Sequence, residues 1–166
     1  MSETMYLSDN DIKTFVHNII RQMAKDEFRP DYIVGLTRGG LVPAVMISHY
    51  LEVPMETLKV SLRDDEGVQE SNLWMAEDAL LRKNILIVDD INDTGATINH
   101  ILTDWPSGCL PDSPAWNDVW NNNVKFAVLV NNITSTSTVN YFGTEINKTE
   151  KDVWVTFPWE EFWKVI

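Results

Sequence analysis

Residues 85–97 have the sequence Ile85-Leu86-Ile87-Val88-Asp89-Asp90-Ile91-Asn92-Asp93-Thr94-Gly95-Ala96-Thr97, and this stretch indicates the fold more clearly than any other. Its four leading apolar residues are typical of a buried parallel strand. Acids at the carboxyl end of such a strand, followed by a small-residue loop that opens a helix, place a cation site beside an anion site. A phosphorylated sugar bound with Mg²⁺ needs both. For the two adjacent acids alone, a helix cap and an acidic metal pocket are the alternatives.

Strands and helices alternate on either side of this stretch. A cap-rich start at Ser8–Asp11 predicts a helix that ends before Pro30, and further helices are expected at 41–51 and 96–104. Strands are predicted at 31–36, 57–61, 85–90, 124–130 and 153–159. The alternation favours an α/β fold with a parallel, doubly wound sheet.

Three stretches do not fit the alternation. Residues 63–78 are polar and predict a mobile loop that could close over a site. Residues 105–123 are rich in proline, tryptophan and asparagine, and predict a surface insert with a short helix and a possible oligomer contact. Residues 131–138 suit a loop, and Tyr141 and Phe142 are expected to precede a turn.

Composition limits the partners and the compartment. The 166 residues fit one domain, 1–166, and a 44% hydrophobic share is ordinary for a globular protein. Thirteen basic against 25 acidic residues give a net charge of −12, which argues against nucleic acid and anionic membranes as partners. Cys109 is the only cysteine, and the N-terminus lacks a basic start and an apolar core. We therefore expect a cytoplasmic protein.

A second loop, Thr37-Arg38-Gly39-Gly40, follows the predicted strand at 31–36. Parallel strands deliver their following loops to one rim of the sheet, so this loop should meet Asp89–Thr97 there. Its glycines allow backbone amides close to an anion, and Arg38 adds a charged fork. A tight turn with no ligand is the alternative for this loop on its own.

Three motifs together resemble a known family. Residues 88–97 resemble the phosphoribosyl pyrophosphate (PRPP) motif of type I phosphoribosyltransferases. Residues 37–43 are similar to the pyrophosphate loop of their bacterial xanthine-guanine branch, and residues 152–160 resemble the hood that covers the base in that branch. The resemblance spans about residues 30–160 and implies the type I fold, a mainly parallel central sheet flanked by helices, with hood elements near 131–166.

The resemblance also implies roles for individual residues. Asp93 would be the general base or a hydrogen-bond partner at the imidazole nitrogen of a purine, with Asp89 and Asp90 on the ribose hydroxyls and Mg²⁺. The implied PRPP-binding set is Arg38, Gly39, Asp89, Asp90, Ile91, Asn92, Asp93, Thr94, Gly95, Ala96 and Thr97. Within it, Arg38 and Gly39 would bind pyrophosphate after a cis peptide at Thr37–Arg38, and residues 94–97 would hold the 5′-phosphate. The implied base-binding set is Asp93, Asn132, Trp154 and Val155.

Two departures from the family pattern keep the acceptor base open. The family has a lysine for the 6-oxo group shortly after the strand that ends near Val130, whereas this chain has Asn131-Asn132-Ile133. The family's mobile loop carries an arginine for pyrophosphate where this chain has Glu70. The predicted reaction is transfer of phosphoribose to guanine, xanthine or hypoxanthine in a homodimer or homotetramer. Transfer to adenine or a pyrimidine, or a PRPP-binding regulator without turnover, are the alternatives.

Overall fold

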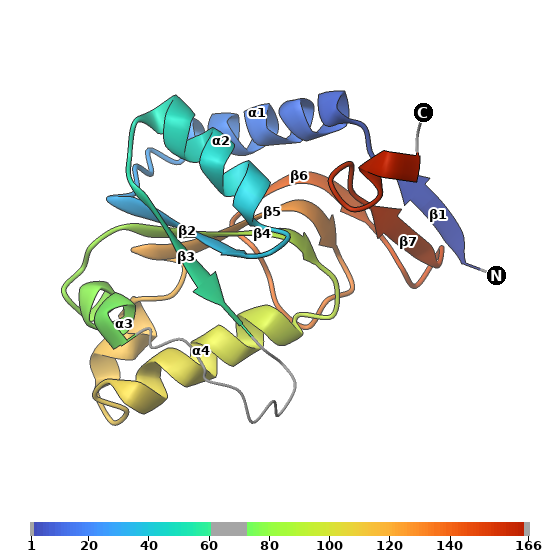
Figure 1. Cartoon of the computed structure of the whole chain (residues 1–166). Coiled ribbons are helices and arrows are strands. Elements are labelled where there is room, and N and C mark those ends of the chain that lie inside the picture. The colour runs from blue at the N-terminus through green and yellow to red at the C-terminus, as the bar shows by residue number, and fades with distance from the viewer. Residues whose placement is uncertain (1, 61–72, 165–166) are drawn as a thin grey trace.

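The structure, a computed structural model, describes residues 2–60 and 73–164. Within this part of the chain, five parallel strands form a central sheet in the order β3-β2-β4-β5-β6 (Figure 1). They are β2 (Tyr32–Thr37), β3 (Met55–Lys59), β4 (Ile85–Asn92), β5 (Val124–Asn132) and β6 (Tyr141–Ile146). β4 lies between β2 and β5, and its first four residues are at most 1% exposed. Burial on both faces explains the continuous apolar run, and the predicted parallel α/β sheet is confirmed.

Helices cover both faces of this sheet, as the sequence predicts (Figure 1). On one face lie α1 (Asp9–Lys25) and α2 (Leu41–Leu51), and on the other lie α3 (Leu73–Leu80) and α4 (Ala96–Gly108). α1 begins with a reciprocal cap, in which Ser8 Oγ accepts from the Asp11 amide at 3.0 Å and Asp11 Oδ2 accepts from the Ser8 amide at 2.9 Å. This cap satisfies amides that have no partner within the helix and fixes where α1 starts.

Residues 105–123 are mostly exposed or half-buried, as a surface insert would be, but Trp105, Trp116 and Val119 are buried in the core. α4 continues through Trp105, which is 1% exposed, and the 3-10 helix η1 (Pro114–Asp118) buries Trp116 in the same core. The ring of Trp116 stacks on that of Trp120 with centroids 5.7 Å apart. Large aromatic surfaces gain most by leaving water, so the tryptophans draw this segment into the core despite its turn-forming residues. The short helix expected within it is confirmed.

Two other expectations need correction. Residues 73–78 of the expected polar loop belong instead to α3, because Met75, Ala76 and Ala79 of that helix are buried under the sheet. Residues 63–72 of the expected loop lie outside the described residues. Tyr141 and Phe142 begin β6 instead of preceding a turn. α1 supports this strand, since the Phe142 amide donates to Gln22 Oε1 at 3.1 Å.

The hood is a separate two-stranded sheet beside the central one (Figure 1). β1 (Glu3–Tyr6) pairs in parallel with β7 (Val153–Thr156), and the 3-10 helix η2 (Phe162–Lys164) follows. β1 was not predicted, and β6 belongs to the central sheet, so the hood takes in the N-terminal strand but not residues 141–146. Among the described residues, we find no helix with the length and apolarity to cross a membrane.

Candidate active site

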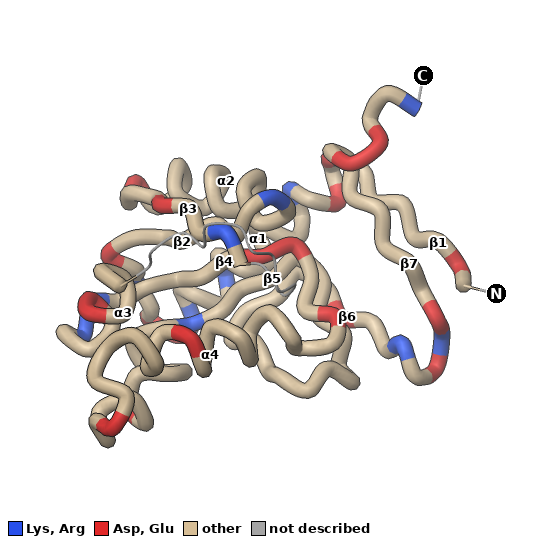
Figure 2. The backbone as a smooth tube through the Cα atoms, turned by 60° about the horizontal axis from the view of Figure 1, so that its bottom comes forward, with Lys and Arg blue, Asp and Glu red and all other residues tan. Residues whose placement is uncertain are grey.

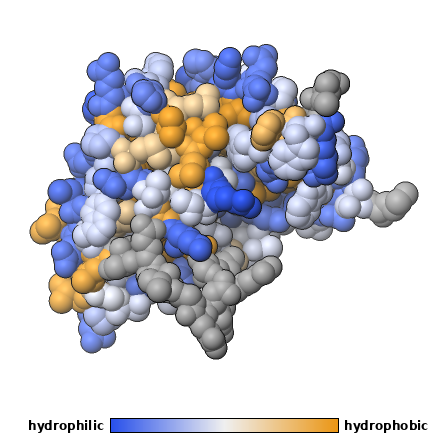
Figure 3. Space-filling model, viewed as in Figure 1, coloured by the Kyte–Doolittle hydropathy of each residue, from blue (hydrophilic) through white to orange (hydrophobic). Residues whose placement is uncertain are grey.

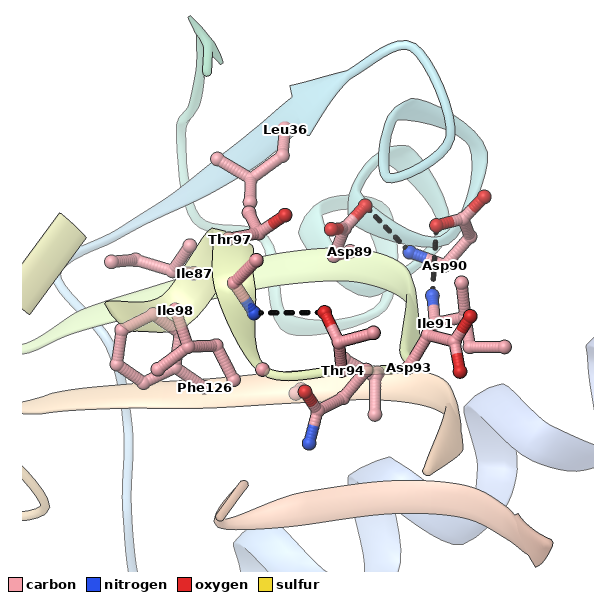
Figure 4. Close-up of a pocket in the computed structure, with 15 residues that line it drawn as sticks. Leu36, Ile87, Asp89, Asp90, Ile91, Asp93, Thr94, Thr97, Ile98 and Phe126 are labelled. Carbon is pink, nitrogen blue, oxygen red and sulfur yellow. Dashed lines mark hydrogen bonds between the residues drawn. The ribbon is translucent and has the colours of Figure 1, made fainter. Parts of the chain in front are cut away.

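The loop that follows β4 lines a cavity of about 270 Å³ at the carboxyl end of the sheet. Asp89 to Ile98 form one wall, and the rest is apolar, from Leu36, Ile87 and residues 126–128 (Figure 4). The carboxyl ends of parallel strands are where α/β proteins bind their ligands. The structure therefore brings the residues predicted from the PRPP motif together around one cavity.

Asp89 and Asp90 are adjacent carboxylates in a poorly hydrated position. Asp89 Oδ1 accepts from the Asp90 amide at 2.9 Å, and Asp90 Oδ1 accepts from the Ile91 amide at 2.8 Å (Figure 4). Burial and the neighbouring Asp90 charge raise the pKa of Asp89 well above its ordinary value. Burial also raises the pKa of Asp90, and the charge of Glu160 adds to the rise. A bound cation, or hydroxyl groups that donate hydrogen bonds, would stabilise the negative charges of two such carboxylates.

This donor set fits a substrate-borne Mg²⁺ better than a metal held by protein alone. Carboxylate oxygens are the hard ligands that Mg²⁺ prefers, and it commonly takes one or two of them plus substrate phosphates. In residues 2–60 and 73–164, no group of three or more His, Cys, Asp or Glu side chains could enclose a metal ion. The carboxylates of Asp89 and Asp90 thus suit a metal whose remaining ligands come from a phosphorylated substrate.

The small-residue part of the loop, residues 94–97, lies at the start of α4. Gly95 has a φ of +94°, and Thr94 Oγ1 accepts from the Ala96 amide at 3.3 Å (Figure 4). A Cβ on Gly95 would lie 2.6 Å from Thr136 Oγ1 and 2.7 Å from the Ser137 amide nitrogen, so only glycine fits. The Thr136 amide donates to the Thr94 carbonyl at 3.0 Å and holds the loop from behind. Amides at a helix start, in a fixed loop, suit a phosphate monoester.

The loop after β2 approaches the acids from the other side. The Thr37–Arg38 peptide bond is cis, as the resemblance implies. A side chain added at Gly39 would overlap the Asp90 carboxylate, so the two loops pack directly on each other. Arg38, Gly39 and Asp90 line a second cavity of about 540 Å³ that extends to the hood.

Trp154 and Val155, which the resemblance implies at the base, both lie on β7 of the hood. Trp154 is 62% exposed on β7 and Val155 is buried, while Trp159 and Trp163 line the larger cavity from the hood side. Asn92 lies on the cavity wall, and its side-chain Nδ2 donates to Asn131 Oδ1 and to the Ser137 carbonyl, both at 2.9 Å.

Arg82, which lies between α3 and β4, donates to the Asp118 carbonyl at 2.8 Å. Arg63 and Glu70 lie outside the described residues.

Sequence reasoning missed a lysine at this site. Lys148 Nζ lies 2.9 Å from Asp93 Oδ2, although it follows β6 and not β5. Asn132 is 5% exposed, and its Nδ2 donates to the Asp93 carbonyl at 2.9 Å. The signal for Lys148 in the sequence is its place two residues after β6, the next strand along the chain, rather than directly after β5.

Comparisons with known proteins agree with this geometry. The phosphoribosyl transferase domain family matches residues 4–164. Xanthine phosphoribosyltransferase 1 of Saccharomyces cerevisiae is 23% identical over 189 aligned residues, covering 96% of this chain and 90% of the relative. Xanthine-guanine phosphoribosyltransferase of Cereibacter sphaeroides is 30% identical over 132 residues, covering 77% of this chain and 68% of the relative.

The fold is also that of a solved relative. The xanthine-guanine-hypoxanthine phosphoribosyltransferase of Helicobacter pylori superposes with a TM-score of 0.69 over 99% of this chain and 97% of its own, at 18% identity. The family match covers nearly the whole chain, and the motif residues surround one cavity. The chain therefore belongs to the type I phosphoribosyltransferase family, in the branch of the xanthine-guanine enzymes, and is a phosphoribosyltransferase.

Proposed function

We propose that this protein transfers the 5-phosphoribosyl group of PRPP to a 6-oxopurine base, releasing pyrophosphate in a Mg²⁺-dependent reaction. Guanine, xanthine and hypoxanthine are the candidate acceptors. One observation carries the proposal: the half-buried carboxylates of Asp89 and Asp90 stand just before the helix-start loop Thr94–Thr97, around one cavity. Paired carboxylates suit hydroxyls and a metal, and a helix-start loop suits a phosphate, so the two parts together fit a phosphorylated ribose.

The proposed chemistry assigns a task to each part of the site. Residues 94–97 hold the 5′-phosphate, and Asp89 and Asp90 bind the ribose hydroxyls, so the sugar carbon is fixed. When bound, Mg²⁺ would offset the charge of the departing pyrophosphate. As the carbon–oxygen bond to pyrophosphate breaks, positive charge grows on the sugar, and the nearby carboxylates stabilise it. The base nitrogen bonds to that carbon, and Asp93 accepts the proton of the imidazole ring.

The test is an assay for pyrophosphate release. The full chain is incubated with PRPP and Mg²⁺ and offered guanine, xanthine, hypoxanthine, adenine, uracil or orotate in turn. Release with the 6-oxopurines supports the proposal, and release only with adenine or a pyrimidine would change the acceptor class. Binding of PRPP without release for any base would indicate a regulator and overturn the proposal.

Location and assembly belong to the same proposal. We expect a cytoplasmic homodimer or homotetramer, with no nucleic acid or membrane as partner. Figure 3 shows an apolar patch over α2, where Val42 and Val45 are 40% and 41% exposed, and such a patch is typical of a contact between subunits. The mass in solution tests the assembly: a monomer at micromolar concentration would contradict it.

A further inference from the structure

Lys148 stands next to the proposed general base from a distant part of the chain. It lies on the turn between β6 and β7, where Figure 2 shows both basic and acidic residues. Its Nζ is 2.9 Å from Asp93 Oδ2, and its side chain is 21% exposed against 42% for Asp93. Lys148 is therefore the more enclosed member of the pair, and its charge is held at the edge of the site.

A single buried amide fastens both members of this pair. Asn132 Nδ2 donates to the Asp93 carbonyl at 2.9 Å, while Asn132 Oδ1 accepts from the Lys148 amide at 3.1 Å and from Thr134 Oγ1 at 3.0 Å. These bonds direct the Asn132 side chain into the protein rather than towards a ligand. Asn132 thus links the backbone at Asp93 to the backbone at Lys148. The group available to a bound base is therefore the ammonium of Lys148 and not the amide of Asn132.

The chemistry of a purine edge defines what Lys148 would meet. N7 and the substituent on carbon 6 are neighbours on one edge, and this substituent is an oxygen acceptor in guanine but an amino donor in adenine. An ammonium has three donors and no acceptor, so Lys148 can bond Asp93 and still donate to a second oxygen. With Asp93 at the imidazole nitrogen, a cation 2.9 Å from its carboxylate lies beside the 6-substituent.

We propose that Lys148 is the specificity-determining residue that selects a 6-oxopurine acceptor, with Asn132 as its positioning residue. This inference rests on the proposed function and on Asp93 as its general base. The cation comes from the exit of β6, two residues past Ile146, and not from the exit of β5. The amino group at carbon 6 of adenine is a hydrogen-bond donor, as is the ammonium of Lys148. The two cannot bond to each other, so adenine is rejected.

The experiment compares bases rather than overall activity. Lys148→Met, which keeps most of the unbranched side chain but removes the charge, should lower kcat/KM for hypoxanthine by about tenfold to a hundredfold, the range for losing one hydrogen bond to a charged group. The ratio of kcat/KM for hypoxanthine to that for adenine should fall at least about tenfold, with KM for PRPP within about twofold of wild type. Lys148→Arg should recover part of the ratio.

Lys151→Met is the matched control. Lys151 lies on the same turn, and its Nζ pairs with Glu3 Oε2 at 2.7 Å on β1, away from Asp93. It should leave the ratio unchanged. Equal losses for hypoxanthine and adenine in Lys148→Met, with an unchanged ratio, would overturn selection by Lys148. Wild-type turnover with adenine alone would also overturn it while leaving phosphoribosyl transfer intact. No pyrophosphate release with any base would instead overturn the proposed function itself.

Discussion

The sugar-phosphate side of the site is one continuous segment, Asp89–Thr97, whereas the base side is assembled from separate segments. Asn132 and Lys148 lie 39 and 55 residues from Asp93 along the chain, and yet both contact it. The continuous side follows from local geometry, because a buried strand ends where a helix begins. The assembled side depends on the pairing of β5 with β6, which sets Asn132 opposite Ile146. A family can therefore keep its donor loop and move the residues that meet the acceptor.

Asp93 belongs to both sides, so its replacement should give the largest effect. Asp93→Asn keeps the shape of the side chain but cannot accept the proton of the base. We expect kcat to fall by on the order of a hundredfold or more for every acceptor base, which is typical of losing a general base. PRPP affinity should change little, because Asp89, Asp90 and residues 94–97 remain. Steady-state kinetics with PRPP and hypoxanthine, together with PRPP titration calorimetry, measure both quantities.

Asp89→Asn is the companion variant, since it removes a carboxylate from the sugar side alone. Intact turnover in Asp93→Asn, combined with lost PRPP binding in Asp89→Asn, would show that the roles are divided differently. Asp93 would then be a structural partner of Lys148 and not the general base.

Gly95→Ala tests the sugar-phosphate side by itself. At a φ of +94° a Cβ is strained, and it would also meet Thr136 Oγ1 at 2.6 Å. The loop must shift to relieve this contact, and about 1.4 kcal/mol of lost phosphate binding corresponds to a tenfold change. KM for PRPP should thus rise at least about tenfold, with the preference between bases unchanged. Gly108→Ala is the control, because its nearest atom would be Leu73 Cδ1 at 3.9 Å.

A change in base preference of Gly95→Ala as large as its change in PRPP affinity would break the comparison. It would mean that the loop at 94–97 and the Asp93–Lys148 pair move as one body.

Asn132→Ala tests the base side and should have a smaller effect than Asp93→Asn or Gly95→Ala. It removes the bonds that link the Asp93 carbonyl to the Lys148 amide. KM for the base should rise several-fold, since a positioning contact and not the reacting group is lost, and KM for PRPP should stay near wild type. Asn131→Ala is the matched control on the neighbouring residue, whose side chain accepts from Asn92 Nδ2 at 2.9 Å. Thermal unfolding of both variants checks that the fold is kept. A larger effect of Asn131→Ala on the base would contradict the role given to Asn132.

The same contrast explains how far the sequence alone could lead. The strand at 85, the acids at its end and the loop at 94–97 were predictable because each depends on neighbours within a few residues. β1 was not, since Glu3–Tyr6 is a short, mostly exposed segment whose hydrogen-bonding partner is β7 at the other end of the chain. Trp105 was misassigned because an aromatic residue among turn formers gives no periodicity, although its 1% exposure shows a core position. Lys148 and Lys151 look alike in sequence, and only the fold separates them, by pairing the first with Asp93 and the second with Glu3.

Asp26 offers the smallest effect, and it separates support of the fold from selection of the base. Asp26 Oδ2 accepts from Lys125 Nζ at 2.6 Å and from the hydroxyl of Tyr141, the first residue of β6, at the opposite end of that strand from Lys148. The hydrogen bond from Lys125, and then that from Tyr141, lowers the pKa of the Asp26 carboxyl below its ordinary value. A carboxyl with a lowered pKa in the folded state stabilises that state fully above its unfolded pKa of about 4, and this stabilisation is lost as the pH falls through the lowered pKa.

Asp26→Asn should therefore lower Tm by a few degrees at pH 7 and by progressively less below about pH 4, as measured by calorimetry. The ratio of hypoxanthine to adenine turnover should not change, because the Asp93–Lys148 pair is untouched. A changed ratio would mean that the start of β6 sets the position of Lys148, and the base side would then extend along the whole strand.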